Sequence, residues 1–436
     1  MTLDRFKNIS PQIRQLVLDF EQQGAHPRFF DADQLEIIAD YYLEACDIDG
    51  LAAAVDYGEK LYPHNPSFRL RRAHLLSIQG HYSSALRLLE KLLKTEPDNT
   101  DVHYSLANIY SLTNQPNLAV RHYLAAAADG CQLGMVYGNI GDEYYKMGYY
   151  AQAVRYYRKA VEENPEEDRS LTALATIWKQ QGRHGRAKTY FNTFIAEHPY
   201  SKTAWDTLAG VLSDDSSYSE AVEAYEYALA IDDSYFHAYF GLADCYHRMG
   251  DVAKAVQTLR MAAPYTNDKA SLFFIIGCYY LEDNNLHTAY TYLRDAVNML
   301  PAYSLSWSYL ALCCEKMGYN EEAASCYRRA ADLEPDLDEP WLQLAQFYIR
   351  TGQYDSAVSV IEESRYHEYP FIFDELLILC YYHLGLRNRM FDILQNNAPL
   401  YASQFPRMLR DYPELAADAE LVAAIRQWVD LYNTEK

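Results

Sequence analysis

Residues 134–167, GMVYGNIGDEYYKMGYYAQAVRYYRKAVEENPEE, contain the pattern that decides the fold. The stretch has a small residue at Gly141, a glycine at Gly148, an alanine at Ala153 and a proline at Pro165. Glycine tolerates the left-handed backbone conformation that ends a helix, and proline lacks the amide hydrogen that a helix interior needs. The stretch therefore predicts a helix, a tight turn at Gly148, a second helix and a short link.

The same pattern recurs at a constant period along most of the chain. This period is the sequence distance from Ala107 to Gly141, and it is repeated from Gly141 to Ala175. Self-similarity at a fixed period marks a repeat array, so it takes precedence over a division into ordinary globular domains. The small residues of the first helices are Ala39, Ala73, Ala107, Gly141, Ala175, Ala209, Ala243, Gly277, Ala311 and Ala345, and those of the second helices are Ala85, Ala119, Ala153, Ala187, Ala221, Ala255, Ala289, Ala323 and Ala357. The predicted turns are at Gly80, Asn114, Gly148, Gly182, Ser216, Gly250, Asn284, Gly318 and Gly352. The prolines of the predicted links are Pro63, Pro97, Pro165, Pro199, Pro301 and Pro335.

Bulky side chains surround the small ones and predict how the units pack. Mostly aromatic residues stand four positions before the first small residue, three positions after it, and on the second helix. Such a stripe is too wide for two helices to bury alone, so successive units must stack. A larger side chain at a helix crossing would overpack it, and we expect Ala187→Leu to lower the melting temperature.

The full pattern of the quoted stretch, Tyr137, Ile140, Gly141, Tyr144, Gly148, Ala153, Tyr157, Ala160 and Pro165, resembles the tetratricopeptide repeat. Nine regular units cover residues 66–371, and a weaker tenth covers residues 32–65, where Leu51 replaces the second alanine. The resemblance implies an all-α fold, a right-handed α-solenoid (superhelix) of tandem helix-turn-helix units with capping helices at both ends. It also implies that the first helix of each unit lines a concave wall, which is the usual peptide site.

Residues 1–31 are expected to contain an N-terminal capping helix. Ser10 and Pro11 suit a helix cap and first helical residue, and an apolar stripe follows at Ile13, Leu16, Val17 and Phe20. The terminal units of a stacked array must face water on one side, which is the role of a cap. A docking segment for a partner is the alternative for either end helix.

Residues 372–436 are expected to form a degenerate repeat followed by C-terminal capping helices. Tyr382 fits the repeat, but Leu379 and Phe391 stand where small residues are expected. A closing helix is predicted over residues 413–432, with one apolar face made by Leu421, Ile425, Trp428 and Tyr432.

Composition excludes several classes of function. The chain has 38 Lys and Arg against 60 Asp and Glu and a formal charge of −22, which argues against nucleic acid as a general partner. The longest apolar run, residues 272–281, is half of the about 20 residues that a membrane-spanning helix needs. Residues 1–23 carry charges and no secretory apolar segment, so neither membrane insertion nor secretion is predicted, and a cytoplasmic location is the default.

Motifs for catalysis or metal binding are absent from the sequence. There is no glycine-rich phosphate loop, H-E-x-x-H or G-x-S-x-G motif. The cysteines, Cys46, Cys131, Cys245, Cys278, Cys313, Cys314, Cys326 and Cys380, form no C-x-x-C pair and suit reduced, buried thiols. We therefore predict no enzyme, no catalytic residue, no metal and no cofactor.

The first helices carry polar and aromatic side chains that packing does not require, and these are the predicted peptide-binding residues. They are Tyr104, Asn108, Asn139, Asp142, Lys146, Arg169, Lys179, Asp206, Phe240, Asp244, His247 and Phe274. Chaperone-binding members of the family clamp a peptide carboxylate with cations and asparagines, but here only Asn108 matches, and Asp142 would repel a carboxylate. The amides of Asn108 and Asn139 are expected either to bind a peptide backbone or to be solvated, in a stretch that Lys146, Arg169 and Lys179 make locally basic.

Further along, Asp206, Asp214 and Asp244 suit a basic or neutral segment, and Phe240 and Phe274 are candidate apolar anchors. Phe240 equally suits contact with a neighbouring helix. The predicted function is a non-catalytic scaffold or adaptor that binds an extended segment of a protein partner in the concave groove. The alternative is a regulatory or sensor array whose curvature responds to a peptide or small ligand. An enzyme would instead need a deep pocket with clustered polar groups.

Overall fold

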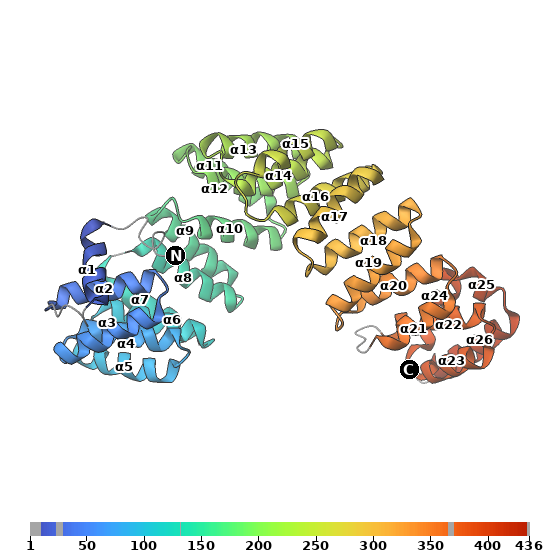
Figure 1. Ribbon diagram of the computed structural model, residues 1–436, viewed down its shortest axis with the longest axis horizontal. Helices are drawn as coiled ribbons and strands as arrows, with labels where there is room; N and C mark the ends of the chain where they lie inside the picture. The colour runs from blue at the N-terminus through green and yellow to red at the C-terminus, as the bar shows by residue number, and fades with distance from the viewer. Residues whose placement is uncertain (1–9, 23–28, 131, 365–369, 434–436) are drawn as a thin grey trace. The chain divides into compact units, whose positions relative to one another are not determined.

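The computed structural model describes residues 10–22, 29–130, 132–364 and 370–433. These residues form helices, turns and links, with no strand among them. The chain divides into two compact units, unit 1 (Met1–Asp232) and unit 2 (Asp233–Lys436), and each is a stack of helical hairpins (Figure 1). The expected cysteine state of Cys131, and parts of the expectations for residues 1–31, lie outside the described residues.

Unit 1 begins with a single helix and continues with six hairpins. In each hairpin the second helix packs against the first, and most second helices also contact the first helix of the next hairpin. The helices are α1 (Pro11–Glu21), α2 (Ala32–Glu44), α3 (Ile48–Leu61), α4 (Pro66–Ile78), α5 (Tyr82–Thr95), α6 (Thr100–Leu112), α7 (Pro116–Ala126), η2 (Ala127–Asp129), α8 (Leu133–Lys146), α9 (Tyr150–Glu163), α10 (Asp168–Gln180), α11 (His184–Glu197), α12 (Lys202–Asp214) and α13 (Tyr218–Ile231).

Unit 2 contains five hairpins followed by further helices, of which the last is as long as the hairpin helices. The hairpins run from α14 to α23, and the last helices pack against the fifth hairpin. The helices are α14 (Phe236–Arg248), α15 (Val252–Ala262), α16 (Lys269–Glu282), α17 (Leu286–Met299), α18 (Ser304–Met317), α19 (Asn320–Leu333), α20 (Asp338–Arg350), α21 (Tyr354–Glu363), α22 (Pro370–His383), α23 (Arg387–Tyr401), η3 (Ala402–Gln404), α24 (Phe405–Asp411), α25 (Pro413–Ala416) and α26 (Ala419–Asn433).

The turns lie at the positions that the sequence predicts. All nine predicted turn residues have positive φ, including the non-glycine residues Asn114 (56°), Ser216 (60°) and Asn284 (58°). The weaker repeat turns at Cys46, with φ 55°. A left-handed residue ends the first helix and lets the second fold back, so the ten predicted helix pairs are confirmed.

The small residues lie at the helix crossings. The nine predicted alanines of the second helices are all buried, none more than 1% exposed. Among the first-helix residues, Ala175 differs because it is only partly buried. Its helix α10 packs against α12 as well as against its hairpin partner α11.

Polar atoms of aromatic residues hold several hairpins to the preceding link. In the repeats of Trp205, Tyr239, Trp307 and Trp341, the side chain four positions before the first small residue donates to the carbonyl oxygen six residues earlier. The indole Nε1 atoms of Trp205, Trp307 and Trp341 donate to Pro199, Pro301 and Pro335 at 2.9, 2.9 and 3.2 Å, and the Tyr239 hydroxyl donates to Asp233 at 3.1 Å. The aromatic position therefore serves hydrogen bonding as well as packing.

The N-terminal helix forms as the sequence predicts. The Ser10 hydroxyl accepts a 3.3 Å bond from the Ile13 amide, and Pro11 is the first residue of α1. Val17 is fully buried and packs with Phe30 and Leu35 in the first core of unit 1.

The register at the C-terminus differs from the prediction by one residue. The turn falls at Gly385 (φ 69°), one residue earlier than the repeat period places it after Gly352. The equivalents of the small positions are therefore Ile378 and Met390, both fully buried, rather than Leu379 and Phe391. By the same shift, Tyr381 rather than Tyr382 is the buried tyrosine of this hairpin.

The prediction of one closing helix over residues 413–432 is wrong. The structure has two helices there, α25 and α26, and the chain between them includes Asp418. The Asp418 carboxylate accepts the Leu421 amide at 3.0 Å and pairs with Arg387 at 2.6 Å, so it caps α26 and ties it to α23. Leu421 and Ile425 are buried as expected. In the described part of the chain, no helix combines the length and apolar character that crossing a bilayer requires.

Candidate functional site

A groove follows the first helices of unit 1. Its larger part has a volume of about 770 Å³ and is lined by residues of α2, α4 and α6, together with Tyr123 of α7. A smaller part of about 350 Å³ is lined by α6, α8 and α10. Ser111 and Tyr123 line both parts, so the two parts adjoin, and together they are lined by residues of five successive first helices. The residues along it are Glu36, Asp40, Leu43, Ser67, Leu70, Arg71, His74, Ser77, Ile78, Asp101, Tyr104, Ser105, Asn108, Ile109, Ser111, Leu112, Tyr123, Asn139, Asp142, Glu143, Tyr145, Lys146 and Arg169.

At the α2–α4 end of the groove, an arginine and a histidine bond to side chains of neighbouring first helices. Arg71 pairs with Asp40 at 2.7 Å and with Glu36 at 3.5 Å. The Nε2 of His74 lies 2.7 Å from the Ser105 hydroxyl, which itself donates to a backbone carbonyl, so His74 is the donor. Burial and the nearby Arg71 charge lower the pKa of His74 below its ordinary value. The imidazole is therefore a neutral donor within this wall.

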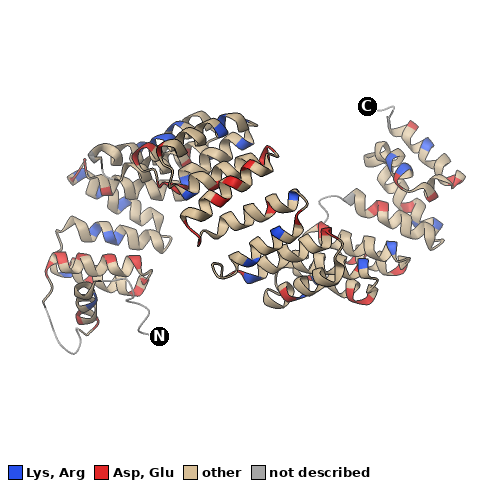
Figure 2. Cartoon of the chain, turned by 90° about the horizontal axis from the view of Figure 1, so that it is seen from above, with Lys and Arg blue, Asp and Glu red and all other residues tan. Residues whose placement is uncertain are grey.

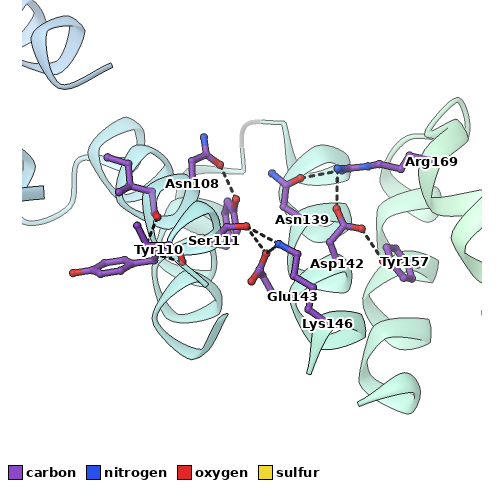
Figure 3. A network of polar contacts seen from close by, with 12 residues as sticks. Asn108, Tyr110, Ser111, Asn139, Asp142, Glu143, Lys146, Tyr157 and Arg169 are labelled. Atoms are coloured by element: carbon purple, nitrogen blue, oxygen red, sulfur yellow. Dashed lines mark hydrogen bonds and ion pairs between the residues drawn. The ribbon is translucent and has the colours of Figure 1, made fainter. Parts of the chain in front are cut away.

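In the middle of the groove, Arg169 joins three repeats into one polar network (Figure 3). Its guanidinium donates to Asn139 at 2.9 Å and to Asp142 at 2.8 Å, and the Asn139 amide donates to Tyr104 at 3.1 Å. The arginine reaches back over α8 because Gly138 has no side chain; a Cβ there would lie 2.9 Å from the guanidinium. The network fixes the orientation of the Asn139 side chain.

Two tyrosines support this network from the second helices. Tyr123 donates to Asn108 at 2.6 Å, and Tyr157 donates to Asp142 at 2.7 Å. Burial, and for Tyr157 also the bond to Asp142, raise the pKa of each phenol well above its ordinary value. The phenols thus remain donors, and the Asn108 amide nitrogen makes no hydrogen bond within the described residues.

The predicted basic stretch is neutralised by acidic neighbours, so the interpretation of a locally basic wall is wrong. Lys146 pairs with Glu143 at 2.6 Å, Arg169 with Asp142, and Lys179 with Asp214 at 2.8 Å. Charged residues of both signs occur on the helices of both units (Figure 2).

The other predicted residues lie outside this groove. On α12, Asp206 is half-buried. In unit 2, Asp244 lies 3.4 Å from Arg248, and His247 stacks on Tyr279 with ring centroids 4.1 Å apart. Phe240 and Phe274 are both partly buried, and each has aromatic neighbours: Phe240 contacts Phe236 of its own helix, and Phe274 contacts Tyr303 and Tyr309.

Sequence reasoning missed the α2–α4 end of the groove. The residues one repeat period before Tyr104 and Asn108 are Leu70 and His74, and those one further period back are Glu36 and Asp40. All four line the groove. Applying the repeat period to the chosen residues would have found them. No cluster of three or more metal-ligating side chains occurs among the described residues.

Equal-length hairpins stacked around a groove define this chain as a helical-repeat protein. A family model described as tetratricopeptide repeat matches residues 76–130, 212–272 and 320–368, and a second of the same description matches residues 136–167. The chain belongs to the tetratricopeptide repeat family, as its repeat pattern predicts.

Curated relatives match this chain over part or most of their length. The tetratricopeptide repeat-containing protein trd-1 of Caenorhabditis elegans is 27% identical over 34% of this chain, and the TPR repeat-containing protein YpiA of Bacillus subtilis is 21% identical over 78%. The anaphase-promoting complex subunit 3 of Schizosaccharomyces pombe is 21% identical over 49%. This chain spans 18%, 73% and 32% of the lengths of these three proteins.

Proposed function

We propose that the protein is a non-catalytic interaction scaffold that binds an extended segment of a protein partner in the groove of unit 1. Tetratricopeptide repeat proteins generally mediate protein–protein contacts, and one relative is by name a subunit of a complex. The groove along α2, α4, α6, α8 and α10, made of two adjoining parts, carries the proposal.

Exposed apolar side chains on the groove support this function. Ile78 and Leu112 occupy equivalent positions of α4 and α6, and they are 49% and 64% exposed. Apolar side chains in a recessed surface with polar groups nearby are typical of a binding site. They suit apolar residues of a bound segment, while the free amide nitrogen of Asn108 suits a backbone carbonyl of that segment.

The other predicted residues keep their proposed roles on this basis. Tyr104, Asn139, Asp142, Lys146 and Arg169 belong to the groove. We propose Tyr104, Asn139, Asp142 and Arg169 as its polar contacts, while Lys146 lines the groove beside Glu143. The remaining ones, Lys179, Asp206, Phe240, Asp244, His247 and Phe274, are proposed as contacts outside the groove. No membrane or nucleic acid is proposed as a partner, and the cytoplasm is the proposed location.

A peptide selection tests the groove. A random peptide library displayed on phage is selected against the full chain, and the selected peptides are then measured against a double variant, Ile78→Asp/Leu112→Asp. The matched control is Leu124→Asp, because Leu124 is 44% exposed on the second helix α7 and does not line the groove.

The expected result is a loss of affinity of at least about tenfold in the double variant and no loss in the control. Unchanged far-UV circular dichroism and melting temperature would show that both variants fold. Peptides that bind the double variant as well as the native chain, or a selection that yields no peptides, would overturn the proposal.

A further inference from the structure

Glu143 of α8 is an acidic residue at a position that is otherwise filled by buried side chains without a carboxylate. The equivalent residues of the neighbouring repeats are Leu75, Ile109, Ile177 and Val211, all buried. The Glu143 side chain is itself only 2% exposed. Packing of the repeat does not require a carboxylate there, and burying one is costly unless it is paired.

The carboxylate of Glu143 is only half satisfied. Its Oε1 accepts bonds from the Ser111 hydroxyl and the Lys146 ammonium, both at 2.6 Å. Its Oε2 is buried and has no hydrogen-bond partner among the described residues. A buried acceptor without a donor costs about 1–3 kcal/mol, so this oxygen favours a ligand that brings a second donor.

Lys146 is the removable part of this arrangement. Its side chain is 46% exposed and lines the 350 Å³ part of the groove together with Glu143. It occupies the position that is equivalent to the exposed Ile78 and Leu112 of the preceding repeats. At this position the exposed apolar side chains are thus replaced by a lysine, which donates to the buried Glu143 carboxylate at 2.6 Å and to the Ser111 hydroxyl at 2.8 Å.

The charges of the groove favour a basic ligand. The acidic side chains along it, Glu36, Asp40, Asp101, Asp142 and Glu143, outnumber the basic ones, Arg71, Lys146 and Arg169. A neutral His74 does not alter this balance, and the whole chain has a formal charge of −22. A cationic segment is therefore attracted to the groove.

We propose that Glu143 is the acceptor for an arginine side chain of the bound segment, which displaces Lys146. A planar guanidinium donates two parallel bonds and satisfies both Oε1 and Oε2, whereas the ammonium of Lys146 reaches only Oε1. This inference rests on the proposed function, and it names the chemical class of the ligand: an extended segment with an arginine.

The spacing of the repeats predicts where the arginine stands. Packed neighbouring helices lie about 8–10 Å apart, and an extended chain advances about 3.3–3.6 Å per residue. Ser111, the neighbour of Leu112 on α6, bonds to Glu143 of α8 at 2.6 Å, so we expect a side chain in contact with Leu112 to be about three residues away from one that reaches Glu143. The expected ligand has an apolar residue and an arginine three positions apart.

Synthetic peptides test this pattern directly. The probes are fluorescein-labelled glycine–serine peptides of about a dozen residues with a leucine and an arginine three positions apart, made in both sequence orders. Matched peptides carry citrulline, which has the shape of arginine without its charge. Binding to the full chain is measured by fluorescence anisotropy at physiological ionic strength, where long-range attraction is screened.

Two pairs of variants separate the buried site from general charge attraction. Glu143→Gln removes the acceptor, and its control Glu162→Gln removes an equal charge from α9, where the side chain is 66% exposed. Lys146→Met removes the internal competitor, and its control Lys188→Met removes a lysine that is 40% exposed on α11. Circular dichroism and melting temperature report the folding of each variant.

The expected result is at least about tenfold tighter binding of an arginine peptide than of its citrulline counterpart. This preference should disappear in Glu143→Gln and persist in Glu162→Gln. Lys146→Met should bind the arginine peptide several times more tightly than the native chain, a gain that misfolding does not produce, and Lys188→Met should not.

Three results would overturn the inference: equal binding of arginine and citrulline peptides, a preference that survives in Glu143→Gln, or no binding of any of these peptides at about 1 mM. None of them decides the proposed function, because that depends on library peptides and on Ile78 and Leu112. A groove that binds library peptides without preferring arginine would keep the function and lose this inference.

Discussion

The hydroxyl of Tyr157 donates a 2.7 Å hydrogen bond to the carboxylate of Asp142, which connects the core of a repeat to the surface of the groove. One repeat earlier, Tyr123 makes the equivalent bond to Asn108 at 2.6 Å. The Tyr157 ring lies directly over Gly141, where a Cβ would be 2.6 Å from the ring carbon Cδ1. A small residue, a tyrosine and a polar groove residue therefore depend on one another.

Gly141→Ala should lower the melting temperature, although alanine is the better helix former by about 0.8–1.0 kcal/mol. The added Cβ meets the ring of Tyr157, which is 2% exposed and has no free space, and overpacking of this kind costs about 1–3 kcal/mol. Differential scanning calorimetry measures the change.

Gly210→Ala is the control for this substitution. Gly210 also lies inside a first helix, α12, but the nearest atom to its Cβ would be the Tyr225 hydroxyl at 3.9 Å. We expect this variant to gain up to about 1 kcal/mol. Equal stabilisation by both alanines would contradict the close packing at Gly141.

Ala187→Leu tests the helix crossing of a second helix. Ala187 is 1% exposed in α11, so the larger side chain should destabilise the protein by about 1–3 kcal/mol and lower the melting temperature. Ala196→Leu in the same helix is the control because Ala196 is exposed. An unchanged melting curve for Ala187→Leu would refute the assigned repeat register.

The regular part of the fold could be predicted from the sequence because its markers are local. A residue such as Gly148 or Asn284 takes positive φ within one turn, whatever the distant parts of the chain do. At the C-terminus the markers are lost, since Ile378 and Met390 fill positions that are small elsewhere. Only packing reveals that the turn has moved to Gly385.

The groove could be predicted only in part. Tyr104 and Asn108 were found because they stand at positions of a first helix that packing does not require, and both are half-buried side chains that line the groove. The ion pairs of Arg71 with Asp40 and of Arg169 with Asp142 join neighbouring repeats, and their side-chain directions leave no periodic mark in the sequence. The buried Glu143 did leave one, as an acid at an apolar position of the repeat.

Ser216→Gly should stabilise the protein by about 0.5–1 kcal/mol, because a residue with a Cβ is strained in the left-handed region and glycine is not. Ser216 has φ 60° and an exposed side chain, so no packing is lost. Ser217→Gly is the control, since Ser217 has φ −82° and glycine should bring no gain there. The melting temperature distinguishes the two, and a gain at Ser217 alone would contradict the turn assignment.

Acid should destabilise unit 1 through His122. Its Nδ1 lies 2.9 Å from Nδ1 of His103, and its ring stacks on Tyr110. Burial, followed by the charges of His103 and Arg121, lowers the pKa of His122 to about 4 from its ordinary value of 6.5. Between these two pH values the unfolded chain binds a proton that the folded chain does not, so stability is full above pH 6.5 and falls as the pH drops towards 4.

Replacing the titrating group should flatten this dependence. Melting temperatures between pH 7 and pH 4.5 are expected to fall less steeply for His122→Gln than for the native chain, and the residual slope includes His74, whose pKa is also lowered. His287→Gln, a change of an exposed histidine on α17, should leave the native slope unchanged. If the melting temperatures of His122→Gln and of the native chain fall equally steeply with decreasing pH, the pair of His103 and His122 is not the cause of the loss of stability in acid.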